Sequence, residues 1–173
     1  MTAHQPVAII LAAGTGSRFG ADRPKQFLTL MGRPVLVHSL DQHTRLGHHV
    51  ITVVSAPMRE EVEGYLEEFL PGRSVQFADG GSTRRESVLS GIDAIPDHVD
   101  PDAPVLLRNA ASPNTPDELI DNVVGGIGEH DGMQAFVRSN ETTFVRAHDN
   151  LDWIIRRDIT GFTVDPTAYR RSL

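Results

Sequence analysis

Residues Val7 to Phe27 read VAIILAAGTGSRFGADRPKQF, and this stretch decides the fold that we expect. It begins with a continuous apolar run, Val7 to Leu11, that is followed closely by glycines. A short apolar run of this kind is typical of a parallel strand buried on both faces of a sheet. We therefore predict a buried strand followed by a loop that carries Gly14, Gly16, Arg18 and Lys25.

The rest of the chain alternates between strand-like and helix-like patterns. This alternation predicts βαβ units, and so an α/β fold with a Rossmann-like, mainly parallel sheet flanked by helices. The length of 173 residues suits a single domain, residues 1–173. Beyond Asp149 the pattern is irregular. The expected helices are Pro34–Thr44, Met58–Leu70, Thr83–Ile95 and Pro116–Ile127, and the further strands are His49–Ser55, Ser74–Ala78, Pro104–Leu107 and, more weakly patterned, Met133–Arg138 and Thr142–Ala147.

Composition narrows the class of protein. The formal net charge is −7, so the chain lacks the broad basic surface that binding to nucleic acid requires. Its N-terminal apolar run is too short to span a membrane and has no basic segment before it. There is no cysteine, which excludes disulfides and cysteine–zinc sites. We expect a cytoplasmic protein that binds neither nucleic acid nor membrane.

Three loops follow predicted strands, and we expect them to form one site. They contain Gly14, Gly80 and the segment Arg108–Pro113. Ligands of open parallel sheets bind at the carboxyl ends of the strands, where these loops would meet.

The first loop has the chemistry of a phosphate site. Gly14 and Gly16 allow positive φ and close backbone approach, and successive N–H groups in such a loop can surround phosphate oxygens. Arg18 offers a planar fork for phosphate, and Lys25 a compact charge that follows Pro24. The dinucleotide fingerprint and the P-loop pattern both fail here. The alternative is a plain glycine-rich turn with solvated charges.

The segments LAAGTGSRFG and PKQF resemble the signature of the sugar-phosphate nucleotidyltransferases. More narrowly, they are similar to 2-C-methyl-D-erythritol 4-phosphate cytidylyltransferase and to ribitol-5-phosphate cytidylyltransferase, with Gln26-Phe27 favouring this cytidylyl branch. The resemblance implies a nucleotide-diphospho-sugar transferase fold, CTP as ligand and a role in isoprenoid biosynthesis. It also implies catalytic roles for Arg18 and Lys25, and nucleotide contacts from Leu11, Ala12, Ala13, Gly14 and Gly16.

The second loop and the helix after it, GGSTRRESV at residues 80–88, resemble the pattern G-G-x-x-R-x-x-S-V of the same family. The resemblance implies backbone contacts to the nucleotide at Gly81 and Ser82. It further implies a structural or base-proximal role for Arg84 and a hydroxyl contact from Ser87 to cytosine. The alternative is an ordinary helix cap, formed by Ser82 or Thr83, beside a surface arginine.

The third loop departs from the family. Where the family has H-D-A-A-R-P, this chain has Arg108-Asn109-Ala110-Ala111-Ser112-Pro113. The resemblance implies Mg²⁺ held by the aspartate, but neutral Asn109 is a weak ligand for that ion. We expect Asn109 to contact the nucleotide and Arg108 to bring a positive charge beside the metal position. Asp79, Asp102 and Asp117 are possible substitute ligands, although solvated or capping roles are favoured for each.

The C-terminal part resembles the family only faintly. Residues 136–162 are similar to a shortened form of the β-arm through which family members dimerise and bind substrate. The resemblance suggests a homodimer and sugar-phosphate contacts from Arg138 and Arg146, with surface arginines on a strand edge as the alternative. After about Phe162 the last helix and strand of the family fold have no counterpart.

Three possibilities follow from these residues. The first is transfer of CMP from CTP to a polyol or sugar phosphate of the methylerythritol 4-phosphate type, with release of pyrophosphate. The second is a catalytically impaired nucleotide-binding paralogue that acts as a regulator, scaffold or partner subunit, because Asn109 lacks the carboxylate. The third is that this chain forms part of a larger or altered polypeptide.

Overall fold

The computed structural model describes residues 4–15, 23–129, 132–138, 143–146, 153–156 and 161–170. Its central sheet has six strands in the order β5-β4-β1-β6-β10-β7. Neighbouring strands from β5 to β6 are parallel, and β10 is antiparallel to both of its neighbours. The bounds are β1 Val7–Leu11, β4 His49–Val54, β5 Gln76–Asp79, β6 Pro104–Asn109, β7 Gly132–Arg138 and β10 Gly161–Arg170.

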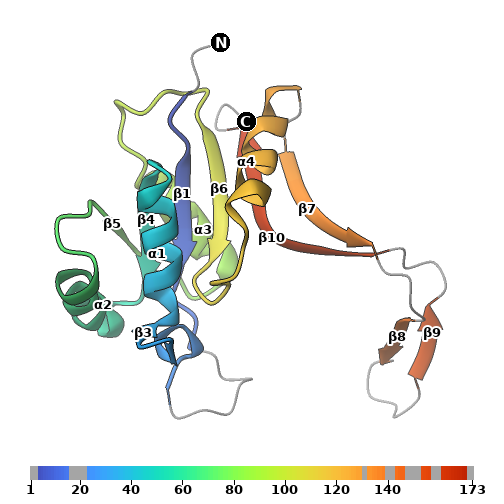
Figure 1. The fold of residues 1–173 in the computed structure, drawn as a ribbon, viewed down its shortest axis with the longest axis horizontal. Helices are drawn as coiled ribbons and strands as arrows, with labels where there is room; N and C mark the ends of the chain where they lie inside the picture. The colour runs from blue at the N-terminus through green and yellow to red at the C-terminus, as the bar shows by residue number, and fades with distance from the viewer. Residues whose placement is uncertain are drawn as a thin grey trace.

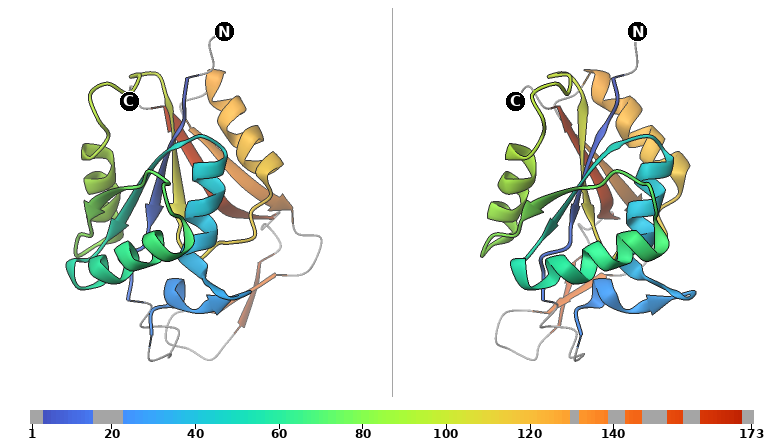
Figure 2. Two further views of the ribbon diagram at one scale, coloured as in Figure 1. Left: turned by 60° about the vertical axis from the view of Figure 1, so that its left-hand side comes forward. Right: turned by 90° about the vertical axis from the view of Figure 1, so that its left-hand side faces the viewer.

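Helices cover both faces of this sheet (Figures 1 and 2). Ala8 and Ile10 of β1 pack on the side of α1 and α2, whereas Val7 and Ile9 belong to a second cluster on the opposite face. Strand residues alternate between faces, so a strand covered on both sides must be apolar throughout. Figure 1 shows α1 and α4 in front of the sheet and α3 behind it. The helices are α1 Val35–Arg45, α2 Ala56–Phe69, α3 Arg84–Asp93 and α4 Asp117–Gly125.

Several short elements complete the described part of the chain. A single 3-10 turn lies between the first loop and a two-stranded ribbon, and a second one follows α4. A separate pair, β8 and β9, is antiparallel and lies away from the main sheet in Figure 1. The bounds are η2 Lys25–Phe27, β2 Thr29–Leu30, β3 Arg33–Pro34, η3 Gly126–Glu129, β8 Thr143–Arg146 and β9 Trp153–Arg156.

The predicted α/β class is confirmed, with a mainly parallel sheet and the four expected helices. The expectation of irregular structure beyond Asp149 is wrong, because β9 and β10 lie there. Pro166 interrupts the sequence pattern of β10, and the pairing of β10 with β7 shifts register between Val164 and Thr167. Proline is normally excluded from the interior of a strand, but it is tolerated where the pairing is irregular, as it is here.

Within the described residues, no helix combines the length and apolar character needed to cross a membrane. The predicted single domain, residues 1–173, and the predicted arm, residues 136–162, stay predictions.

Candidate functional site

A cavity of about 570 Å³ lies at the carboxyl ends of β1, β4, β5 and β6. All three predicted loops contribute to its wall, as the position of ligand sites in parallel sheets predicts. Ser55, which directly follows β4, also lines the cavity. It could have been predicted from the same rule, because it lies at the carboxyl end of a parallel strand. The described lining residues are Leu11, Ala13, Gly14, Thr15, Lys25, Gln26, Ser55, Gly81, Ser82, Thr83, Arg84, Ser87, Asn109, Ala110 and Ala111.

Gln26 holds the first loop in place. Its Nε2 donates to the carbonyl oxygens of Ala12 at 2.7 Å and of Gly14 at 2.8 Å, and its side chain is buried. The Ala12 N–H in turn donates to the carbonyl oxygen of Val53 at 2.8 Å, which ties the loop to β4. Ala12 itself is buried and does not line the cavity. The sequence pointed to Gln26 through the family resemblance, but its positioning role depends on contacts that the sequence does not show.

Of the two uses expected for Gly14, positive φ and close backbone approach, the first is not observed. A Cβ added there would meet nothing within 4 Å. The fold therefore does not require a glycine here, and the bare backbone of Gly14 leaves space in the cavity. Gly16 and Arg18 lie outside the described residues, so their predicted phosphate contacts stay predictions.

Lys25 is exposed and lines the cavity from the first residue of η2. Pro24, with φ of −56°, precedes this turn. Two residues later, Phe27 is fully buried and makes an edge contact with Tyr65, 5.9 Å between ring centroids. The buried aromatic ring anchors the turn from which Lys25 lines the cavity.

The second loop is rigidly capped. Thr83 begins α3 with a capping box: its hydroxyl accepts from the N–H of Glu86, and the carboxylate of Glu86 accepts from the N–H of Thr83. Gly80 is required for close packing, since an added Cβ would lie 2.3 Å from the Cβ of Ala13. Because Gly80 has no side chain, the second loop can pack directly against the first loop at Ala13. Of the two predicted caps, Ser82 and Thr83, it is Thr83 that caps α3, and it also lines the cavity.

The polar groups of this loop are already engaged with one another. Gly81 donates its N–H to Ser87 Oγ at 3.1 Å, and Ser87 Oγ donates to the carbonyl oxygen of Thr83 at 3.0 Å. Ser82 donates both its N–H and its hydroxyl to Glu86. A nucleotide that binds this loop would therefore meet carbonyl oxygens and the remaining hydroxyl lone pairs of Ser82 and Ser87, or it would displace these bonds. The predicted nucleotide contacts of Gly81, Ser82 and Ser87 stay predictions.

Arg84 and Asn109 both line the cavity, and their side chains are hydrogen-bonded to each other. Arg84 Nη1 donates to Asn109 Oδ1 at 2.8 Å, which joins the start of α3 to the end of β6. The predicted position of Arg108 beside this point is wrong. Arg108 is fully buried on the opposite side of β6, where Nη1 donates to Thr115 Oγ1 at 2.8 Å and Nη2 to the Ser112 carbonyl oxygen at 3.1 Å. Adjacent strand residues point to opposite faces, so the positive charge near Asn109 comes from Arg84.

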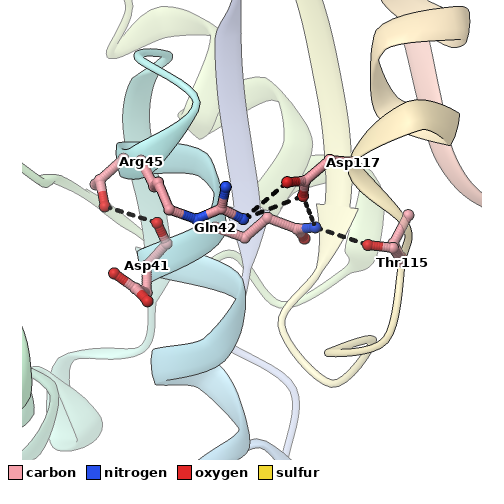
Figure 3. A network of polar contacts seen from close by, with 6 residues as sticks. Asp41, Gln42, Arg45, Thr115 and Asp117 are labelled. Atoms are coloured by element: carbon pink, nitrogen blue, oxygen red, sulfur yellow. Dashed lines mark hydrogen bonds and ion pairs between the residues drawn. The ribbon is translucent and has the colours of Figure 1, made fainter.

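A polar network fixes the segment between β6 and α4 to α1 (Figure 3). Gln42 Nε2 donates to the Thr115 carbonyl oxygen at 2.6 Å and to Asp117 Oδ1 at 2.7 Å. Arg45 Nη2 donates to Asp117 Oδ2 at 2.9 Å, and these two hydrogen bonds hold the pKa of Asp117 below its usual value. The loop that ends at α4 is therefore held firmly from the helix side.

Next to this network, His43 is fully buried in α1. Desolvation, followed by the positive charge of Arg108, lowers the pKa of His43 to about 3. Its Nδ1 lies 2.9 Å from Nδ1 of His48, whose pKa is also lowered by burial. Both imidazoles are therefore neutral at neutral pH, and neither lines the cavity formed by the described residues.

The described residues do not fit a divalent cation at the family's metal position. Mg²⁺ is bound in proteins by carboxylates together with water and phosphate. The described lining contains neither aspartate nor glutamate, and the only side-chain oxygen of Asn109 faces the guanidinium of Arg84. Nowhere in the described part of the chain do three His, Cys, Asp or Glu side chains form a group that could hold a metal.

The three aspartates considered as substitute ligands lie elsewhere. Asp117 bonds to Gln42 and Arg45, Asp79 is exposed with a carboxylate oxygen 3.9 Å from Arg59 Nη1, and Asp102 lies in the turn before β6, at the opposite end of the sheet. None of them lines the cavity formed by the described residues. The side chains of Arg138 and Arg146 lie outside the described part of the structure, so their sugar-phosphate contacts stay predictions.

Comparison with known proteins identifies the family of this chain. The family model of 2-C-methyl-D-erythritol 4-phosphate cytidylyltransferase matches residues 7–157. An enzyme of that name from Alteromonas mediterranea is 37% identical over 131 residues, which cover 76% of this chain and 52% of the relative. One from Haemophilus influenzae is 31% identical over 156 residues, which cover 90% of this chain and 65% of the relative. The chain thus spans about half to two thirds of the length of these relatives.

Solved structures show the same fold. The crystal structure of 4-diphosphocytidyl-2C-methyl-D-erythritol synthase from Anaerococcus prevotii matches with a TM-score of 0.76 and 22% identity, over 98% of this chain and 72% of that one. The bifunctional IspDF of Campylobacter jejuni matches with a TM-score of 0.74 and 20% identity, over 98% of this chain and 42% of that one. Given the family match over residues 7–157, the chain belongs to the 2-C-methyl-D-erythritol 4-phosphate cytidylyltransferase family.

Proposed function

We propose that this protein is a cytidylyltransferase that moves CMP from CTP to a polyol or sugar phosphate of the 2-C-methyl-D-erythritol 4-phosphate type and releases pyrophosphate. The cavity at the carboxyl ends of β1, β4, β5 and β6 carries this proposal, because it brings the three predicted loops into one wall. Membership of the family and the names of the relatives support the choice of nucleotide and acceptor.

The proposed chemistry is in-line displacement at phosphorus. A phosphate oxygen of the acceptor attacks the α-phosphorus of CTP, a new P–O bond forms, and the bond to the β-phosphate breaks as pyrophosphate leaves. Lys25, and Arg18 from the same loop, would stabilise the negative charge that develops on the phosphoryl oxygens. The remaining contribution is positioning of the two substrates by the loops.

The acceptor would bind toward the C-terminal part of the chain. In this proposal residues 136–162 act as a shortened arm, Arg138 and Arg146 contact the sugar phosphate, and two copies form a homodimer. A cytoplasmic location belongs to the same proposal. Sedimentation velocity of the purified chain tests the dimer directly. A monomer at all concentrations would contradict the proposed homodimer.

The central test measures binding and turnover together. Calorimetric titration with CTP, UTP, ATP and GTP should show binding of CTP in preference to the others. A pyrophosphate-release assay with CTP, Mg²⁺ and either methylerythritol 4-phosphate or ribitol 5-phosphate should then show turnover with the first acceptor. Binding without turnover would leave a nucleotide-binding protein, and absence of CTP binding would overturn the proposal.

Lys25→Ala tests where the triphosphate lies. Loss of one charge-assisted contact should weaken CTP binding by about tenfold or more, because such contacts contribute about 1.5–3 kcal/mol. Arg73→Ala removes the same charge at an exposed position outside the cavity lining and is the matched control. Equal CTP affinity of the two variants would show that the triphosphate does not contact Lys25.

A further inference from the structure

The charge on the cavity wall has one sign. Among the described lining residues, Lys25 and Arg84 carry charge, and the others are neutral. Glu86 lies in sequence between the lining residues Arg84 and Ser87, but its carboxylate accepts hydrogen bonds from Ser82 N, Ser82 Oγ and Thr83 N. It thus belongs to the cap of α3 and does not line the cavity. A polyanion entering this site meets positive charge and neutral groups, and no carboxylate among the described lining residues.

The contact between Arg84 and Asn109 occupies the place where the family holds a cation. Asn109 Oδ1 accepts from Arg84 Nη1 at 2.8 Å, so the amide orients a guanidinium whose other N–H groups remain to bind an anion. A divalent cation at Asn109 would lie within a few ångströms of this fixed positive charge and would gain no protein carboxylate in return. The nearby positive charge and the lack of a carboxylate ligand both oppose binding of a cation, and both favour binding of phosphate.

We propose that the cavity binds its nucleotide as the metal-free polyanion, with Arg84, oriented by Asn109, taking the phosphate charge that a divalent cation would otherwise neutralise. This inference rests on the proposed function, because it assumes that a nucleoside triphosphate enters the cavity. It assigns Arg84 to the phosphates, whereas the family resemblance implies a structural or base-proximal role.

The test is calorimetric titration of the full chain with CTP, first in EDTA and then in excess Mg²⁺. CTP should bind at least as tightly in EDTA as in Mg²⁺, because complexation removes negative charge from the ligand. A dissociation constant that is about tenfold or more weaker in EDTA would overturn the inference.

Variants at the two residues make the test specific. Asn109→Asp places a carboxylate against Arg84 with almost unchanged shape. It should weaken CTP binding in EDTA by about tenfold, with binding regained when Mg²⁺ is added. Asn109→Asp that binds CTP as the wild type does in both buffers would also overturn the inference.

Arg84→Ala separates a phosphate contact from a contact to the base. It should lower the affinity for CTP in EDTA by about tenfold and leave the affinity for cytidine unchanged. Arg85→Ala, at the adjacent exposed position outside the cavity lining, removes the same charge and should leave both affinities unchanged. An equal loss for CTP and cytidine in folded Arg84→Ala, verified by circular dichroism, would place Arg84 at the base and overturn the assignment.

The two levels of the proposal fail in different ways. CTP that binds tightly only in Mg²⁺ overturns the metal-free site and leaves the proposed function standing. CTP that binds in neither buffer overturns the proposed function and this inference together.

Discussion

Gln26 is the residue that converts a glycine-containing stretch into a fixed loop. Its amide bridges two carbonyl groups of that loop from a buried position. Gln26→Ala leaves these acceptors without their donor, which should lower the free energy of unfolding by about 1–3 kcal/mol. Because the loop also forms the cavity wall, we expect CTP affinity to fall by about tenfold in the same variant. Urea denaturation and calorimetry measure the two effects.

Gln76→Ala is the control for this prediction. Gln76 Nε2 donates to the Ala94 carbonyl oxygen at 2.6 Å, which is a bond of the same kind away from the cavity. The Gln76→Ala variant should be less stable than the wild type but should bind CTP with the same affinity. If both variants keep the wild-type affinity, Gln26 does not position the nucleotide loop.

Two glycines of the site should respond to alanine in opposite ways. Gly80→Ala places a methyl group 2.3 Å from the Cβ of Ala13, so the first two loops must separate. Overpacking of this kind costs about 1–3 kcal/mol, and thermal unfolding should show the loss. Gly14→Ala meets no atom within 4 Å and should leave stability nearly unchanged while weakening CTP binding. A large stability loss in Gly14→Ala would contradict the conformation described for this loop.

Residue chemistry was predictable where it follows from neighbours in sequence, and less so where it depends on tertiary contact. Lys25 lines the cavity as expected, since a strand–loop–turn sequence already places it there. The bond from Arg84 to Asn109 joins residues that are 25 positions apart, and no local pattern reveals it. Arg108 was assigned to the wrong side, although alternation along β6 already separates it from Asn109.

At the scale of the element, α3 depends on its capping box. The hydrogen bonds from Ser82 and Thr83 hold the pKa of Glu86 below its usual value of 4.5. The stabilisation is therefore fully present above about pH 4.5 and is lost as the pH falls through the lowered pKa of the folded state. Glu86→Gln keeps the shape but does not titrate. The difference in unfolding free energy between wild type and Glu86→Gln should shrink from about pH 6 to about pH 3. Urea denaturation at several pH values measures it, and a constant difference would contradict the ionised cap.

Elements with a strong local signal were predictable, and those defined by their partners were not. The apolar runs of β1 and β4 and the apolar face of α1 identify themselves in the sequence. Strand β10 contains Pro166 and pairs on both sides with strands far away in sequence. Its position depends on the long-range pairing with β6 and β7, which local periodicity does not encode.

At the scale of the whole molecule, the buried His43 and the half-buried His48 beside it should set the response to acid. The pKa of His43 is lowered to about 3 by burial and by Arg108, with Asp117 acting in the opposite direction. Unfolding lets the imidazole take up a proton near pH 6.5, so stability is present above that pH and declines below it. His43→Gln should make the decline between about pH 6.5 and pH 4 shallower, by up to about 1.4 kcal/mol per pH unit.

Urea denaturation of wild type and His43→Gln across this pH range measures the two slopes. His48 keeps its own lowered pKa in the variant, so part of the decline should remain. Equal slopes for the two proteins would show that His43 titrates in the folded state as it does in the unfolded chain.

The strand order also has a consequence for biosynthesis. Strand β10 inserts between β6 and β7, although both of these leave the ribosome before it. A nascent chain that has emerged only as far as β9 can pair β5, β4, β1 and β6, but it leaves the facing edges of β6 and β7 open. Open strand edges are templates for pairing with other chains, and long-range closure is slow. Chaperone binding during translation should therefore be strongest in the interval before residues 161–170 emerge, and it should fall once they are released.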